Sequence, residues 1–194
     1  MKHLKILGLA VVSALSLMAT SGAGTAAADK ICTTEDCSGE TTIDTLEISQ
    51  VGTSTYSTTG GTTLLTCGAG EIHVSITNQG AGVDPITGSV QETKLTECTN
   101  TVPTLSNGSI DVTATGGNGT VAFTGSEITT NGIFGVSCVY GSGAALDIGA
   151  FEGTTLNVNT PVPRISGGFT CPSDVVWKAS FQITNHSMVY FLNS

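Results

Sequence analysis

The chain of 194 residues is poor in charge and in aromatic side chains: charged residues make up 11% of it, aromatic residues 5%, and there is one tryptophan. Basic residues are scarce, with six Lys and Arg against fifteen Asp and Glu. A surface with so few cations repels phosphate backbones and anionic headgroups, which excludes nucleic acid and electrostatic membrane docking. After residue 28 no ten-residue run has helical spacing, which argues against a helical domain.

The first 28 residues have the order of a secretory signal peptide. Lys2 and Lys5 precede an apolar run from Ile6 to about Ala19, and the small residues Thr25–Ala28 precede Asp29. The apolar core is shorter than the ~20 residues that a spanning helix needs, so cleavage after Ala28 is expected rather than a membrane anchor. The remaining chain has four basic and fifteen acidic residues, a formal net charge of −11. We therefore expect a secreted protein, either extracellular or on the cell surface.

Short alternating stretches predict β-strands throughout the rest of the chain. Ile72, Val74 and Ile76 alternate with polar residues, and Ser109–Thr115 with Thr120–Thr124 predicts a hairpin across a glycine-rich turn. Residues 52–61 are polar and predict a loop, while Pro161-Val-Pro163 predicts a sheet edge or a strand start. About nine to eleven strands in residues 42–194 predict one all-β domain, an antiparallel β-sandwich of immunoglobulin-like or jelly-roll-like type.

All six cysteines follow the signal segment, and an even count in an exported chain predicts disulfides. Six cysteines allow fifteen pairings, among which chain order favours Cys32–Cys37, Cys67–Cys98 and Cys138–Cys171. The first pair closes a small loop in an N-terminal extension, residues 29–41. No Cys-x-x-Cys occurs, so zinc is disfavoured. The acids of the extension, Glu35, Asp36 and Glu40, lack the order of a calcium loop.

No catalytic residue, metal ligand or cofactor site is predicted. His73 and His186 are the histidines that remain after the signal segment, and no Gly-x-Ser-x-Gly nucleophile elbow accompanies them. Two carboxylate pairs fall on single strands or loops, Glu92 with Glu97 and Asp147 with Glu152. A glycosidase would need several aromatic residues along a groove beside such a pair, and these are scarce here.

Trp177 and Tyr140 are the candidate ligand platform. Trp177 alternates in phase with Val175 and Phe181, a pattern that favours a place in the core. A sugar platform would require the indole to face outward. Tyr140 ends an apolar stretch, Ile133–Tyr140, that predicts a central strand.

The four later cysteines carry a resemblance to a known group. Thr66-Cys67, Leu95-Thr-Glu-Cys98, Cys138-Val-Tyr-Gly141 and Gly168-Phe-Thr-Cys171-Pro172 with Trp177-x-Ala179 resemble small exported bacterial proteins with four spaced cysteines. More loosely, they are similar to secreted proteins named as activators of alkane oxidation. The resemblance covers roughly residues 60–194 and implies a β-sandwich released from the cell or held in its matrix. It supplies no catalytic residue, and the Cys32/Cys37 loop departs from its pattern.

Three functional hypotheses follow. The first is an exported, non-enzymatic surface, envelope or biofilm-matrix protein that acts through binding or adhesion. The second is a carbohydrate-binding module that takes a cell-surface glycan on Trp177, and the third is a small secreted hydrolase. Self-association belongs to the first hypothesis, because the apolar Met188–Leu192 strand could add to the sheet edge of a neighbour. Pairing of this strand within its own sheet is the alternative, and the tendency of consecutive strands to be neighbours favours it.

Overall fold

The computed structural model describes residues 29–38, 43–79, 85–99, 103–115, 117–131 and 136–193, and all of their regular structure is β-strand. The expected signal segment, residues 1–28, lies outside these ranges. So do Glu40 and the beginning of the strand expected from Ile133.

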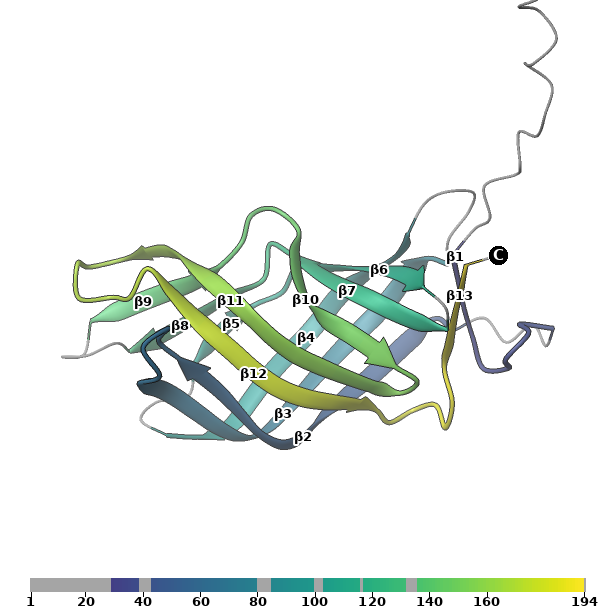
Figure 1. Cartoon of the computed structure of the whole chain (residues 1–194), viewed down its shortest axis with the longest axis horizontal. Coiled ribbons are helices and arrows are strands. Elements are labelled where there is room, and N and C mark those ends of the chain that lie inside the picture. The colour runs from purple at the N-terminus through teal and green to yellow at the C-terminus, as the bar shows by residue number, and fades with distance from the viewer. Residues whose placement is uncertain are drawn as a thin grey trace, which may run out of the picture.

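Eight antiparallel strands lie in the spatial order β10, β7, β6, β4, β3, β2, β12, β11 (Figure 1). Their bounds are β2 (Thr45–Ser57), β3 (Thr63–Asn78), β4 (Ile86–Cys98), β6 (Ser109–Thr115), β7 (Asn118–Thr124), β10 (Leu146–Glu152), β11 (Thr155–Gly167) and β12 (Asp174–Ile183). The predicted hairpin is confirmed, because β6 and β7 pair from Ser109↔Thr124 to Thr115↔Asn118.

The eight strands close into a barrel, so the predicted sandwich is wrong. The first and last strands of the order, β10 and β11, pair with each other from Gly149↔Val158 to Glu152↔Thr155. This pairing removes both sheet edges that a sandwich would leave open. Alternation along a strand shows that one face is buried, and that property is common to the inner face of a barrel and to the facing sheets of a sandwich.

Side chains fill the interior of the barrel, as expected for eight strands. Buried residues alternate with exposed or half-buried ones along much of the barrel strands. The buried set includes Leu46, Ile48, Ile72, Val74, Ile110, Val112, Val121, Ile148, Phe151, Leu156 and Phe181.

One end of the barrel is covered by three further strands, β5 (Thr104–Ser106), β8 (Glu127–Asn131) and β9 (Ser137–Gly141), which we call the flap (Figure 1). The flap joins the barrel through β11, whose last residues, Arg164–Gly167, pair with β9. The middle of β11, residues 159–163, pairs only with β12, because β10 pairs with the residues before it and β9 with the residues after it. Pro161 and Pro163 lie in this stretch, where a missing N–H costs no ladder bond on the open side. The prolines therefore occupy the middle of a long strand rather than a strand start.

The other end is closed by a two-stranded sheet of β1 (Asp29–Cys32) and β13 (Tyr190–Asn193) (Figure 1). Phe191 is fully buried and stacks on Phe151, with ring centroids 5.2 Å apart. The buried Asp29 carboxylate accepts a hydrogen bond from the Ala114 main-chain N–H at 2.9 Å. The segment expected to be an N-terminal extension thus packs against the barrel, and the terminal strand pairs with it rather than standing free.

The loop expected over residues 52–61 is wrong for its first half, because β2 continues to Ser57. The pairing of β2 with β3 shifts register between Ser49 and Ser54, so that residues 50–53 of β2 do not pair with residues 68–70 of β3. After the shift, the side chains of Ser54 and Tyr56 are buried inside the barrel.

Three disulfides join the cysteines in the pairs that chain order favours: Cys32–Cys37, Cys67–Cys98 and Cys138–Cys171. The last two close loops with sequence separations of 31 and 33, each of which contributes about 3–4 kcal/mol in the chain-entropy description. Cys138–Cys171 ties the flap strand β9 to the turn between β11 and β12. Three disulfides in one small domain indicate an oxidising environment.

Candidate functional site: an aromatic recess at the barrel mouth

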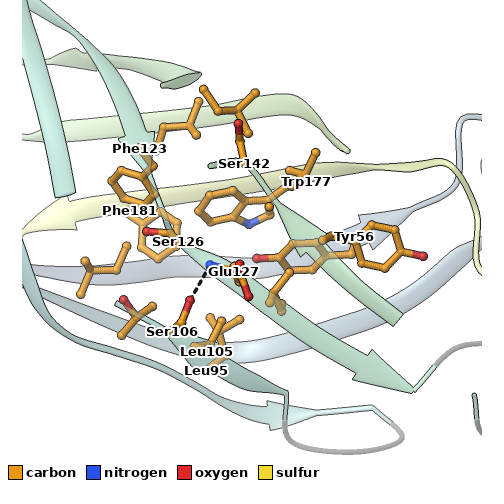
Figure 2. A pocket seen from close by; sticks show the side chains of 18 residues that line it. Tyr56, Leu95, Leu105, Ser106, Phe123, Ser126, Glu127, Ser142, Trp177 and Phe181 are labelled. Atoms are coloured by element: carbon orange, nitrogen blue, oxygen red, sulfur yellow. Dashed lines mark hydrogen bonds between the residues drawn. The ribbon is translucent and has the colours of Figure 1, made fainter. Parts of the chain in front are cut away.

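The described part of the chain has an apolar recess where the flap meets the barrel (Figure 2). The recess has a volume of about 60 Å³. We call it the mouth recess and define it by its lining, which is Tyr56, Ile72, Thr93, Leu95, Leu105, Ser106, Phe123, Ser126, Glu127, Ile128, Tyr140, Gly141, Ser142, Leu146, Ile148, Val162, Trp177 and Phe181. The barrel strands supply most of its apolar side chains, whereas the flap and the residues next to it supply most of its polar ones.

Four aromatic rings form the floor of the mouth recess. Trp177 lies parallel to Tyr56, with centroids 5.7 Å apart and planes 7° apart. Phe181 meets the indole edge-on at 6.0 Å, and Phe123 is tilted against it at 6.4 Å (Figure 2). The arrangement follows from register, since Trp177 pairs with Tyr56 across β12 and β2 and both face inward. Offset and edge-on contacts of this kind stabilise aromatic clusters beyond their buried area.

The polar end of Trp177 is satisfied within the barrel. Its Nε1–H donates to the Ser54 hydroxyl at 3.0 Å, and Ser54 is completely buried. The indole is itself 8% exposed. The ring therefore lies inside the barrel, where it cannot serve as a platform on the outer surface.

The Ser106 side chain joins two strands of the flap to each other. The Ser106 hydroxyl accepts a hydrogen bond from the Glu127 main-chain N–H at 2.9 Å (Figure 2). It also donates to the Gly125 carbonyl at 3.4 Å. These bonds join β5 to the beginning of β8. The Cys138–Cys171 bridge ties β9, the flap strand next to β11, to the turn between β11 and β12.

Two tyrosines line the mouth recess, and their hydroxyl groups differ in access. The Tyr140 hydroxyl is sealed from solvent and has no hydrogen-bond partner among the described residues. Burial raises the pKa of Tyr140, and Asp174 adds to this while Arg164 opposes it. The Tyr56 side chain is 4% exposed, and burial raises its pKa far above the ordinary tyrosine value. Both groups are therefore neutral phenols at physiological pH.

The described lining of the mouth recess carries a single charge, and it is negative. Glu127 is the one charged residue in the described lining, which contains no lysine, arginine or histidine. Together with the acidic composition of the chain, this disfavours anions at the mouth.

The structure separates most of the polar residues that the sequence singles out. His73 is half-buried on β3, opposite Glu47 and Glu92, whereas His186 lies beside the Thr45 carbonyl at 3.2 Å. Glu92 and Glu97 are exposed on β4, and Asp147 and Glu152 are exposed on β10. Asp36 accepts from the Ser38 N–H and hydroxyl, which lowers the pKa of its carboxyl group. None of these acids or histidines lines the mouth recess in the described part of the chain.

Trp177 and Tyr140, the candidate platform residues, both line the mouth recess. Tyr56 and Phe123 complete it and were not identified from the sequence as site residues. Phe123 falls in a predicted strand, but Tyr56 falls in the segment expected to be a loop. Thr53-Ser-Thr-Tyr-Ser57 has no alternation of polar and apolar residues, so the sequence carries no signal that would have placed Tyr56 inside.

A second, polar cleft of about 180 Å³ lies at the register shift of β2. It is lined by Ser49, Gln50, Ala69, Gly70, Glu71, Lys94 and Thr96. The Gln50 amide donates to the carbonyls of Gly52 and Cys67, at 2.8 and 2.9 Å, and so fills the gap in the barrel wall. A Cβ on Gly70 would lie 2.8 Å from both Gln50 Oε1 and Leu95 Cδ2, so a larger residue there would displace these side-chain ends.

No family model matches the chain, and neither a curated protein nor a solved structure is significantly similar to it. In the residues that the structure describes, no helix has the length and hydropathy of a membrane span. Across the same residues, His, Cys, Asp and Glu side chains do not gather in groups of three or more that could hold a metal ion.

Proposed function

We propose that the protein is an exported, non-enzymatic binding protein whose mouth recess receives the apolar part of a small molecule. The observation that carries this proposal is the aromatic floor of Trp177, Tyr56, Phe123 and Phe181 at the mouth of an otherwise filled barrel. Barrel mouths are common ligand sites, and such sites combine apolar walls with a few placed polar groups. The signal segment and the disulfides support a place outside the cell.

The size of the mouth recess limits what enters it. At about 10–15 Å³ for each atom of the size of a water oxygen, about 60 Å³ accommodates roughly four to six atoms. A short alkyl end fits this limit, as does a single ring that reaches partly into the open mouth, whereas a long chain would remain largely outside. Burying six such carbon atoms at about 0.8 kcal/mol each gives a gross gain of about 5 kcal/mol, and because association has its own entropic cost, we expect an affinity no tighter than about millimolar.

The single tryptophan provides a direct test. Because Trp177 is the only tryptophan and forms part of the floor, benzene that enters the mouth recess should shift its emission and the NMR signal of its indole N–H. Leu105→Phe enlarges a half-buried side chain of the lining and should abolish the shift. Leu64→Phe makes the same change at a half-buried position outside the lining and should leave it intact. A saturable shift that is unchanged in Leu105→Phe would place binding elsewhere, and no shift at all would refute the proposal.

Adhesion through a surface contact is the second candidate function, and one residue favours it. Phe169 is 99% exposed at the turn between β11 and β12. Arg164 donates from its guanidinium to the carbonyls of Gly168 and Cys171, and Cys171 is bridged to Cys138, so both sides of the turn are fixed. A fully exposed aromatic side chain on a fixed turn is a suitable anchor for a partner surface.

A further inference from the structure

The floor of the mouth recess has two polar atoms, and they differ in what they offer a ligand. Trp177 Nε1 already donates to Ser54. The Tyr56 hydroxyl has no hydrogen bond to any described residue, and burial is the sole cause of its raised pKa. The Tyr140 hydroxyl is sealed from solvent and has no partner, whereas the Tyr56 hydroxyl is not sealed in this way. The Tyr56 hydroxyl is thus a buried, neutral group that lines the recess and is open to a partner there.

We infer that the mouth recess selects a neutral ligand with a compact apolar ring or short chain and one hydroxyl or carbonyl group, which forms a hydrogen bond with Tyr56. This inference rests on the proposed function and names the class of its ligand. The ring or chain packs on the aromatic floor, while its oxygen accepts from, or donates to, the phenol.

Physical chemistry favours such a ligand over a plain hydrocarbon. A buried hydroxyl without a partner carries a desolvation cost, and a site with an unpaired polar group discriminates strongly in favour of a ligand that pairs with it. A hydrocarbon of the same shape leaves the cost in place. A ligand oxygen removes it without changing the apolar contacts.

The same geometry disfavours carboxylates. A carboxylate that leaves water needs a cation or several donors, and the described lining has no lysine, arginine or histidine. Glu127 at the recess adds a like charge. Fatty acids and aromatic acids should therefore bind more weakly than the corresponding alcohols.

Benzene, phenol and benzoate test the inference because they share one ring and differ in the polar group. Each is titrated into the native protein and into Tyr56→Phe, with the Trp177 signals as readout. Tyr56→Phe keeps the ring that stacks on Trp177, and its melting curve verifies the fold. We expect the ratio of phenol affinity to benzene affinity to fall by about tenfold in Tyr56→Phe, which corresponds to about 1.4 kcal/mol. Benzene affinity should be unchanged, and benzoate should not bind the native protein.

A matched variant locates the effect. Tyr190→Phe removes a hydroxyl at the opposite end of the barrel, where it contacts Met188 Sδ, and should leave the ratio unchanged. If benzene binds but the ratio is the same in Tyr56→Phe, or if benzoate binds as well as phenol, the inference is wrong while the binding function stands. If none of the three probes binds, both proposals are wrong.

Discussion

Ser54 and Trp177 are joined by a hydrogen bond of 3.0 Å inside the barrel, at the point where β2 resumes its pairing after the register shift. Ser54 is completely buried and its hydroxyl accepts the indole N–H. The bond therefore couples the irregular part of β2 to the aromatic floor of the mouth recess. A serine in a polar stretch of sequence is what holds the tryptophan ring in place.

Ser54→Ala should destabilise the protein by about 1–3 kcal/mol, because the buried indole N–H would lose its partner. Urea denaturation followed by Trp177 emission measures this change. Ser180→Ala is the control, since its hydroxyl bonds to Asn157 at an exposed position of the neighbouring strand. A Ser54→Ala variant as stable as Ser180→Ala would show that the bond contributes little.

The three disulfides should differ in their contribution to stability. In the chain-entropy description the bridges with separations of 31 and 33 stabilise by about 3–4 kcal/mol, whereas the bridge with a separation of 5 stabilises by about 2 kcal/mol. Double Cys→Ala variants of each pair, compared in thermal melts, should show the smallest loss for Cys32–Cys37. A melting curve that does not change on full reduction would contradict the structural role of the bridges.

Stability should fall above the ordinary tyrosine pKa of 10.0. Burial raises the pKa of Tyr56 in the folded state, so the unfolded chain loses the phenol proton at a pH where the folded protein still holds it. Unfolding then releases a proton, and each such group lowers stability by up to about 1.4 kcal/mol per pH unit. Tyr140 changes in the same direction.

Urea denaturation between about pH 9 and pH 11 tests this linkage. Tyr56→Phe should show a shallower decline than the native protein, and the double variant with Tyr140→Phe a shallower one still. Tyr190→Phe serves as the control. Equal slopes for Tyr56→Phe and the native protein would mean that the phenol is not buried as the structure shows.

Phe169→Ser should separate adhesion from folding. The side chain is exposed at 99%, so the free energy of unfolding should change by less than about 0.5 kcal/mol. If the turn is an adhesive contact, the variant should sediment less with the cells that produce the protein. Met188→Ser, at a residue 54% exposed near the other end of the barrel, should not alter sedimentation. Equal sedimentation of both variants and the native protein would count against the adhesive turn.

Much of the fold follows from local sequence, because alternation and turn chemistry act within a few residues. Val175, Trp177 and Phe181 are buried on one face as predicted, and the β6–β7 hairpin forms where glycines permit its turn. The closure of the barrel cannot be predicted in this way. It depends on the pairing of Gly149–Glu152 with Thr155–Val158 after the whole sheet has curved, and no local sequence pattern distinguishes a closed barrel from two open sheets. Pro161 and Pro163 predicted a sheet edge, and locally they lie at one, because this part of β11 has a partner strand on one side only.

The site could be predicted only in part for a similar reason. Trp177 and Tyr140 were identified from residue type, and the structure brings both to the mouth recess. Tyr56 lies in a polar stretch of sequence that belongs to β2 because the strand resumes its pairing with β3 after the register shift. The shift depends on β3 and is therefore not visible in the sequence of β2. The ligand-facing hydroxyl thus arises from pairing between strands, which is not encoded within either strand alone.

The pairing of Asp29 with Asn193 in the β1–β13 sheet also determines where a fusion partner or a solid support can be attached to the protein. Both positions lie at the closed end of the barrel, away from the flap (Figure 1). A fusion partner, affinity tag or solid support joined next to either position would therefore lie at the end of the barrel opposite the flap. The mouth recess and the turn that carries Phe169 would face solution, and the protein could be displayed on a sensor surface without obstructing either.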